Sequence, residues 1–258
     1  MKILWKLDQH RMLKKAGISH SLFLDAISYT YRKNKYREWN DLGVKEAEKL
    51  GIMFSRETPP QSLFEIFFDG IYDFADFRPH EGDVIIDVGA GYGDSALWWW
   101  KKFGAVVYAY EVLPHVYKVL AENIRLNNAS VNAFNIAIGD GSLTEGYLHS
   151  SGNMLQIANH PKEGKNFLTT KIDSLNLPEP VLIKVDVEGF ELKVLRGAEK
   201  TIEAHKPRII IETHSTALRK ECHTFFEKHG YSLEHVGRTV KPKNSWMNEV
   251  TNLFYSSD

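Results

Sequence analysis

Apolar runs of strand length alternate with helical patterns along most of the chain. Five runs rich in branched apolar residues predict buried strands: Val84–Val88, Ala105–Glu111, Val131–Ile138, Val181–Val187 and Arg208–Thr213. Helical spacing of apolar residues predicts helices at Asp94–Phe103, from Pro114 to about Asn127, at Phe190–Ala204 and at Thr216–His229. Repeated strand–helix units of this kind form parallel, doubly wound sheets.

Two further strands close the chain, at Tyr231–Gly237 and Glu249–Ser256, and no helical pattern separates them. One of the two therefore runs antiparallel, and we expect it to be the final strand. The segment Leu143–Leu177 is irregular and predicts a hairpin or a flexible insertion. The expected fold class is α/β, with a doubly wound, seven-stranded and mostly parallel sheet.

The N-terminal segment differs from the rest of the chain. Residues 1–56 are helix-prone, and Met1–Leu50 holds 11 Lys/Arg against 6 Asp/Glu. Paired prolines within Glu57–Ser62 predict a break, and apolar spacing over Leu63–Phe77 predicts a helix that leads into the main domain. We therefore expect a helical, basic cap at residues 1–60 and one main domain at residues 61–258.

Composition excludes several classes of protein. The 258 residues carry a net charge of -1, so no overall charge attracts nucleic acid or a membrane surface. A single cysteine, Cys222, cannot form an internal disulfide or a thiolate metal site. The N-terminus lacks the apolar core of a signal peptide, and no window approaches the length of a membrane span. A cytoplasmic location is expected.

Three glycines in the sequence DVGAGYG separate the first predicted strand from the helix that follows. Gly89, Gly91 and Gly93 would leave backbone N–H groups open beside a helix N-terminus, which suits a nucleotide-like ligand. A dinucleotide-binding fingerprint needs its third glycine one position later, and no Gly-Lys-Ser/Thr follows to make a P-loop. With Asp87 included, the run resembles motif I of the class I S-adenosylmethionine-dependent methyltransferases.

The next two strands add to this resemblance. Glu111 ends the second predicted strand, 24 positions after Asp87, where a carboxylate can accept hydrogen bonds from ribose hydroxyls. The third strand leads into Gly139 and Asp140, where methyltransferases of this class often place an adenine contact. The resemblance thus implies a Rossmann-like methyltransferase fold.

Two later segments, Ile183–Ile202 and Lys206–His214, look like the FkbM-type methyltransferases. They match the Lys-x-Asp-x-Glu-Gly-x-Glu segment and the Pro-x-x-x-x-Glu-x-His strand of that family. The resemblance covers Leu63 to about His229, and it implies S-adenosyl-L-methionine as cofactor and O-methylation of a small-molecule or glycan- or lipid-type acceptor. The implied cofactor contacts are Asp87, Gly89, Ala90, Gly91, Gly93, Glu111, Val112, Asp140 and Asp186.

The catalytic candidates lie at the ends of the fourth and fifth strands, where four carboxylates and one imidazole are expected to converge on one rim: Asp186, Glu188, Glu191, Glu212 and His214. We expect Asp186 to orient the cofactor's methyl end or the acceptor, with Glu188 beside it. His214 is the candidate base, because the ordinary histidine pKa lies near neutrality. In the alternative interpretation Glu188 caps the next helix, Glu191 lies on a solvated face, and Lys184 pairs with these carboxylates. A divalent metal held by Asp186 and its neighbours is a minor alternative, but no metal site is predicted, because no His/carboxylate spacing here is diagnostic of one.

Two basic and aromatic stretches bear on the acceptor. Tyr29–Trp39 interleaves four cations with four aromatic residues; we interpret it as an amphipathic helix that covers the main domain, and contact with an anionic acceptor is the second interpretation. Together with Gly237–Trp246 it leaves an RNA methyltransferase as an alternative that we do not favour. From another class, an NAD-dependent dehydrogenase or a nucleotide-binding module stays open.

Overall fold

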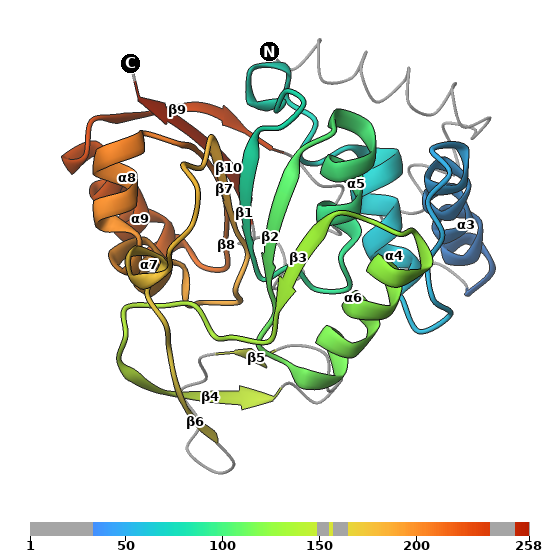
Figure 1. The fold of residues 1–258 in the computed structure, drawn as a ribbon, viewed down its shortest axis with the longest axis horizontal. Coiled ribbons are helices and arrows are strands. Elements are labelled where there is room, and N and C mark those ends of the chain that lie inside the picture. The colour runs from blue at the N-terminus through green and yellow to red at the C-terminus, as the bar shows by residue number, and fades with distance from the viewer. Residues whose placement is uncertain (1–32, 149–154, 157–164, 238–250, 258) are drawn as a thin grey trace.

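A computed structural model describes residues 33–148, 155–156, 165–237 and 251–257. Its centre is a seven-stranded sheet with the strand order β3-β2-β1-β7-β8-β10-β9 (Figure 1). The strands are β1 (Val84–Val88), β2 (Val106–Tyr110), β3 (Val131–Phe134), β7 (Leu182–Val185), β8 (Arg208–Thr213), β9 (Tyr231–Val236) and β10 (Thr251–Ser257). The predicted α/β sheet is confirmed.

The direction of the last strand is also as predicted. β10 pairs antiparallel with both β8 and β9, whereas β1, β2, β3, β7 and β8 pair in parallel. Parallel strands bring their carboxyl ends to one edge of the sheet, where ligands of doubly wound folds bind. The candidate residues after β1, β2, β7 and β8 therefore meet along this edge.

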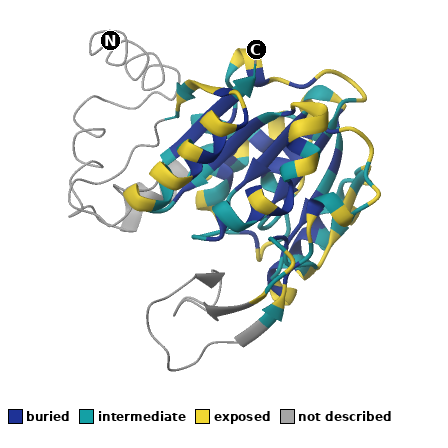
Figure 2. Cartoon of the chain, turned by 90° about the vertical axis from the view of Figure 1, so that its left-hand side faces the viewer, coloured by how far each residue is buried: buried dark blue, intermediate teal, exposed yellow. Residues whose placement is uncertain are grey.

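Helices cover both faces of the sheet. In Figure 1, α7 (Glu191–Gly197), α8 (Glu199–His205) and α9 (Thr216–Lys228) lie on one side, and α5 (Asp94–Phe103) and α6 (Pro114–Leu126) lie on the other. Alternate side chains of β1 pack into the two helical layers on opposite faces of the sheet. Ile86 belongs to the core cluster of Val194 and Ile202, whereas Ile85 belongs to the cluster of Trp99. Figure 2 accordingly shows buried strands between helices whose outer faces are exposed.

Two predicted helices are interrupted. Leu63–Phe77 is not one helix: α4 (Pro60–Leu63) continues as a π-helical turn, η1 (Phe64–Asp69), which ends at Gly70 in a left-handed conformation with φ of 67°, and a 3-10 turn, η2 (Ala75–Phe77), follows. The helix predicted at Phe190–Ala204 is split into α7 and α8. The split has a tertiary cause, because Asp173 accepts the backbone N–H groups of Lys200 and Thr201 and so caps α8 from outside.

The insertion between the third and fourth strands of the main sheet forms a small antiparallel sheet. It consists of β4 (Leu143–Leu148), β5 (Leu155–Gln156) and β6 (Lys165–Leu168), with β4 in the middle, and the 3-10 turn η3 (Ile172–Ser174) follows. This bears out the hairpin prediction. Phe167 of β6 lies 5.6 Å from the ring of Phe190, so the insertion reaches the carboxyl edge of the main sheet.

The described part of the N-terminal segment packs beside the main domain. Helix α3 (Lys33–Lys49) contacts α4 and η1, and the residues after it bring Ile52 against Leu97 and Trp100 of α5. Among the described residues, the lining of the pocket begins at Val88, and the helical, basic cap expected at residues 1–60 stays a prediction. Residues 1–32, with the start of the Tyr29–Trp39 stretch, lie outside the described residues, and so does most of Gly237–Trp246.

Among the helices of the described segments, none combines the length and apolar character that a membrane crossing requires.

Candidate active site

A pocket of about 170 Å³ opens at the carboxyl ends of β1, β2 and β7. Its lining combines loop backbone after the three strands with apolar side chains and three carboxylates. The lining residues are Val88, Gly89, Gly91, Tyr110, Glu111, Val112, Leu113, Ile136, Ala137, Ile138, Phe167, Asp186, Val187, Glu188 and Phe190. The fold thus gathers parts of the predicted cofactor site and of the predicted catalytic site into one cavity.

The three glycines of the turn after β1 have different surroundings. A Cβ on Gly89 would lie 1.8 Å from the backbone oxygen of Asp186, so this residue allows β1 and β7 to pack closely at their ends. A Cβ on Gly93 would meet Leu120 of α6 at 2.4 Å. Gly91, with φ of 51°, has nothing within 4 Å of a Cβ position and lines the pocket. Gly91 is therefore the glycine that keeps the approach to the cavity open.

Glu111 holds the glycine turn in place. Its two carboxylate oxygens accept the backbone N–H groups of Gly91 at 3.0 Å and of Leu113 at 2.8 Å. The side chain is buried, and burial raises the pKa of Glu111, although the two backbone hydrogen bonds and the charge of Lys184 oppose this. Each oxygen keeps a second lone pair, and the residue lines the pocket together with its neighbour Val112.

Asp87 lies beneath the turn and does not line the pocket. Its carboxylate is fully buried and accepts a hydrogen bond from Ser95 at 2.6 Å. The buried Lys184 lies 3.1 Å from Asp87, donates to the carbonyl of Gly89 at 2.6 Å and lies 3.8 Å from Asp186. Burial disfavours the charged form of Lys184, but Asp87 and Asp186 raise its pKa above the ordinary value. Lys184 thus pairs with Asp186 as expected, but its nearer partner is Asp87, and the lysine joins the glycine turn to the end of β7.

Besides Asp87, three more predicted cofactor residues lie outside the pocket lining. Ala90 is buried and its backbone N–H donates to the carbonyl of Tyr110. Gly93 packs on α6, as described above. The carboxylate of Asp140 accepts hydrogen bonds from the hydroxyl and the backbone of Ser142 in its own turn. Beside the third strand it is Ile136, Ala137 and Ile138 that line the cavity.

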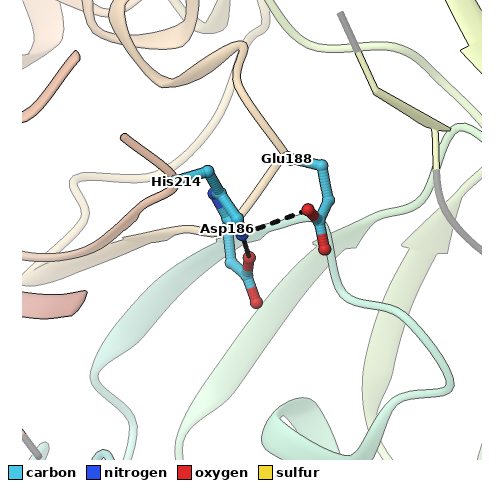
Figure 3. A group of neighbouring side chains, drawn as sticks. All are labelled: Asp186, Glu188 and His214. Carbon is cyan, nitrogen blue, oxygen red and sulfur yellow. Dashed lines mark ion pairs between the residues drawn. The ribbon is translucent and has the colours of Figure 1, made fainter. Parts of the chain in front are cut away.

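Four carboxylates surround His214 at the other end of the pocket. The imidazole Nε2 lies 3.2 Å from Glu188, 3.5 Å from Glu212 and 3.8 Å from Asp186, and Nδ1 lies 2.7 Å from Glu191. Figure 3 shows the ring facing Asp186 and Glu188 together. We call these five residues the carboxylate rim. The convergence predicted from the ends of β7 and β8 is therefore present.

The charge state of His214 differs from the expectation. Burial opposes its protonation, but hydrogen bonds to Glu191 and Glu212 and the charges of Asp186 and Glu188 raise the pKa of His214 to about 11. Burial, and then the charge of Glu212, raise the pKa of Asp186 well above its ordinary value. At neutral pH the imidazole is thus already protonated, and the near-neutral pKa on which its role as a base was predicted is not present in this state.

The alternative interpretation of Glu191 as a residue on a solvated helix face is wrong. Glu191 is fully buried and lies on no solvated face; besides His214 it contacts the backbone N–H of Gly189, which donates to it at 3.0 Å. Helix α7 begins at Glu191, and its N-cap residue Phe190 makes no side-chain cap hydrogen bond; capping by Glu188 stays a prediction. Glu188 has a left-handed backbone with φ of 53°, and it is one of the residues that line the pocket.

Two aromatic residues near the site were missed by sequence reasoning. Phe167 enters the lining from the insertion, which no sequence pattern places near the glycine turn. Tyr72 is buried, stacks on Trp99 with 5.7 Å between ring centroids, and lies under the ammonium group of Lys184. Burial, followed by the charges of Asp186 and other carboxylates, raises its pKa. The segment FFDGIYDF that contains Tyr72 was the available signal.

Comparisons with known proteins agree with this architecture. The model of the methyltransferase FkbM domain matches residues 87–233. The methyltransferase sdnD of Sordaria araneosa is 26% identical over 230 residues, which cover 73% of this chain and 88% of that protein. The hexuronic acid methyltransferase AglP of Haloferax volcanii is 29% identical over 146 residues, which cover 52% of this chain and 57% of that protein.

A solved structure shares the fold. The crystal structure of methyltransferase FkbM from Methylobacillus flagellatus superposes with a TM-score of 0.52 at 16% identity and covers 97% of this chain and 70% of that one. The domain match spans more than half of the chain, from Asp87 beneath the glycine turn to Leu233 of β9. By its sequence, its sheet order and its glycine turn, this chain belongs to the FkbM methyltransferase family.

Proposed function

We propose that this protein transfers a methyl group from S-adenosyl-L-methionine to an oxygen atom of a small-molecule acceptor. The observation that carries the proposal is the pocket itself, in which a glycine turn held by Glu111 faces a cluster of carboxylates across one cavity. One end suits a nucleoside, and the other suits a positively charged reacting centre. Membership of a methyltransferase family supports a single methyl-transfer reaction in which one end binds the cofactor and the other end binds the reacting groups.

The residues of the pocket fit this cofactor. Gly91 leaves open space where any side chain would project, and the remaining lone pairs of Glu111 can accept the two ribose hydroxyls. Apolar groups from Val112, Ile136 and Phe167 offer an uncharged surface for an adenine ring. When bound, S-adenosyl-L-methionine supplies a methyl group on a cationic sulfur. Asp186 and Glu188 line the same cavity and would stabilise that positive charge.

The carboxylate rim also has to bind the acceptor and take up its proton. A protonated His214 donates rather than accepts, so the proton of an acceptor hydroxyl passes to a carboxylate. Asp186 is the best placed carboxylate, because it lines the pocket. Its pKa is raised above that of an ordinary aspartate, so it is a stronger base than an exposed carboxylate. In this proposal His214 and Glu191 orient the rim and limit the repulsion among its carboxylates.

The acceptor is proposed to be a small molecule. The relative AglP is named for a hexuronic acid, which offers hydroxyl and carboxylate oxygens, and this supports an oxygen acceptor here. The negative charge of the rim opposes direct contact with a phosphodiester backbone, so the RNA alternative has no support from the described site. By the same argument an anionic acceptor needs a cation beside it. A neutral hydroxyl is compatible with the rim as it stands.

Calorimetric titration of the purified chain tests the proposal. S-adenosylhomocysteine and S-adenosyl-L-methionine should bind with a stoichiometry near one, whereas NAD should give no saturable signal. Methyl-labelled cofactor should then transfer its label to a sugar-containing or other low-molecular-weight fraction of cell extract. Saturable binding of NAD without binding of S-adenosylhomocysteine would replace the proposal with a dehydrogenase or a nucleotide-binding module.

A further inference from the structure

The arrangement of oxygen atoms around His214 suits a metal ion better than a proton. We propose that Asp186, Glu188 and His214 bind a divalent cation at the inner end of the pocket, with Glu212 beside them. Binding of the ion can be tested without any assumption about the reaction; its role in catalysis rests on the methyl transfer proposed above. The sequence left a metal at Asp186 as a minor alternative only, because the ligands come from the ends of two strands and show no diagnostic spacing.

The distances around Nε2 carry the first part of the argument. An imidazolium N–H directs one strong, short hydrogen bond, of about 2.7–2.9 Å, to a carboxylate. Here Nε2 has three carboxylate oxygens at 3.2, 3.5 and 3.8 Å. Ligand atoms about 2.0–2.2 Å from a common metal ion lie about 3.0–3.5 Å from one another. The candidate ligand atoms of Asp186, Glu188 and His214 all lie within 4.8 Å of one another, so small side-chain movements would complete the shell.

The second part of the argument lies behind the imidazole ring. Metal-binding histidines usually donate their other ring N–H to a carboxylate or a carbonyl, which directs the free nitrogen lone pair at the ion. Glu191 occupies this position, 2.7 Å from Nδ1, and the backbone N–H of Gly189 holds it there. Glu191 is fully buried, and its second oxygen has no hydrogen-bond partner in the structure as described. Buried carboxylates in proteins are hydrogen-bonded or paired with positive charge. An imidazole bound to a cation would be such a partner for Glu191.

The charge balance of the rim agrees with this. Asp186, Glu188, Glu191 and Glu212 carry four negative charges when ionised, and His214 supplies one positive charge. Lys184 lies 3.8 Å from Asp186, but it already forms a shorter ion pair of 3.1 Å with Asp87, so it compensates little of the charge of the rim. A divalent ion in place of the imidazole proton would leave less negative charge uncompensated, and its binding would release that proton.

The proposed position of the ion gives it a chemical role. Asp186 and Glu188 line the pocket, so an ion between them would present an open coordination position to an acceptor oxygen. There it would lower the pKa of a hydroxyl and screen an anionic acceptor from the rim. The hydroxyl proton goes to a rim carboxylate, the oxygen forms the new O–C bond, and the S–C bond of the methyl donor breaks. A mixed set of imidazole and carboxylate ligands suits Mn²⁺ and related ions.

Electron paramagnetic resonance of Mn²⁺ tests the proposal on the full chain, freed of metal by chelation and without cofactor. The signal of free Mn²⁺ should disappear up to about one ion per chain, and the bound ion should show nitrogen modulation from one imidazole. Glu188→Gln and Asp186→Asn should each weaken binding at least about 10-fold, and so should Glu191→Gln through its effect on His214. No bound Mn²⁺ at about 1 mM, the weak end of protein sites for hard cations, would overturn the proposal.

A second cluster in the same chain provides the matched control. Glu199, Glu203 and His229 also bring three potential ligands together, but Glu203 is exposed, and Nε2 of His229 already lies at the short hydrogen-bond distance of 2.9 Å from Glu199. Glu203→Gln should leave Mn²⁺ binding unchanged. If Glu203→Gln removes binding and Glu188→Gln does not, the ion belongs to that cluster and the proposal is wrong. A separate titration with S-adenosylhomocysteine distinguishes failure of the metal site from failure of the proposed function.

Discussion

The two ends of the pocket are built by different means. The glycine end depends on seven consecutive residues, Asp87–Gly93, and its contacts to the cavity are largely backbone. The carboxylate rim depends on side chains that leave two different strands, and its geometry exists only after β7 and β8 have paired. The first end needs open space and the second needs balanced charge. Lys184 connects them, since it contacts both Gly89 and Asp186.

The difference predicts how each end responds to substitution. Changes at the glycine end should act by filling space or removing a hydrogen-bond acceptor, so they should affect ligand binding more than stability. Changes at the rim or at the lysine between the ends should leave charges uncompensated, so they should affect stability as well.

The largest expected effect follows from removal of the connecting lysine. Lys184→Met leaves the buried Asp87 without its cation, and breaking a buried ion pair on one side typically costs about 3–5 kcal/mol. Urea unfolding followed by circular dichroism would measure this loss. Lys102→Met is the matched control, because its pair with Asp73 is partly exposed and should cost at most about 1 kcal/mol. Equal losses in the two variants would remove the structural role given to Lys184.

Filling the open approach at the glycine end should come next. Gly91→Val places a branched side chain in space that is empty in the pocket, and it should weaken S-adenosylhomocysteine at least about 100-fold, or about 2.7 kcal/mol. Gly82→Val is the control: Gly82 also has a positive φ and nothing within 4 Å of a Cβ, but it lies outside the pocket lining. It should suffer similar backbone strain and keep its affinity. Normal binding by Gly91→Val would place the cofactor elsewhere.

A smaller loss of affinity is expected at Glu111. Glu111→Ala removes the acceptor of the Gly91 N–H and of the proposed ribose hydroxyls, so cofactor binding should weaken by about 1–3 kcal/mol. Isothermal titration calorimetry with S-adenosylhomocysteine measures this change in binding free energy. Glu122→Ala, which removes a carboxylate from α6 outside the pocket lining, should bind as the unmodified protein does. Unchanged affinity in Glu111→Ala would remove Glu111 from the ribose site.

The smallest effect concerns the packing behind the carboxylate rim. Cys222 of α9 is fully buried, and burial, with a contribution from the charge of Glu191, raises the pKa of its thiol to about 12. The native protein should therefore not react with a disulfide reagent at pH 8, whereas the urea-unfolded chain should titrate one thiol. Rapid reaction in the native state would mean that the core behind Glu191 opens readily.

Much of the sheet was predictable because its signals are local. The run Val84–Val88 was predicted with the same bounds that β1 has. Four apolar residues and one aspartate, followed by glycine, are typical of a strand that ends at a turn. The order Gly89, Gly91, Gly93 and the carboxylate at Glu111 likewise depend on spacing alone. These parts could be derived before any tertiary contact was known.

The rest depends on contacts between distant segments. The split between α7 and α8 requires Asp173, which lies in η3 well before either helix. The burial of Glu191 and the charge of His214 require each other, 23 positions apart. Neither residue carries a local pattern that distinguishes a solvated helix face from a buried pair. The chemistry of the rim was therefore incompletely predicted, although its members were named.

A crystal structure with S-adenosylhomocysteine bound would test the central claim most directly. We predict its ribose at Glu111, its backbone approach at Gly89 and Gly91, and its sulfur directed toward Asp186 at the carboxylate rim. Density for the ligand at any other surface, with this pocket vacant, would contradict the proposed function.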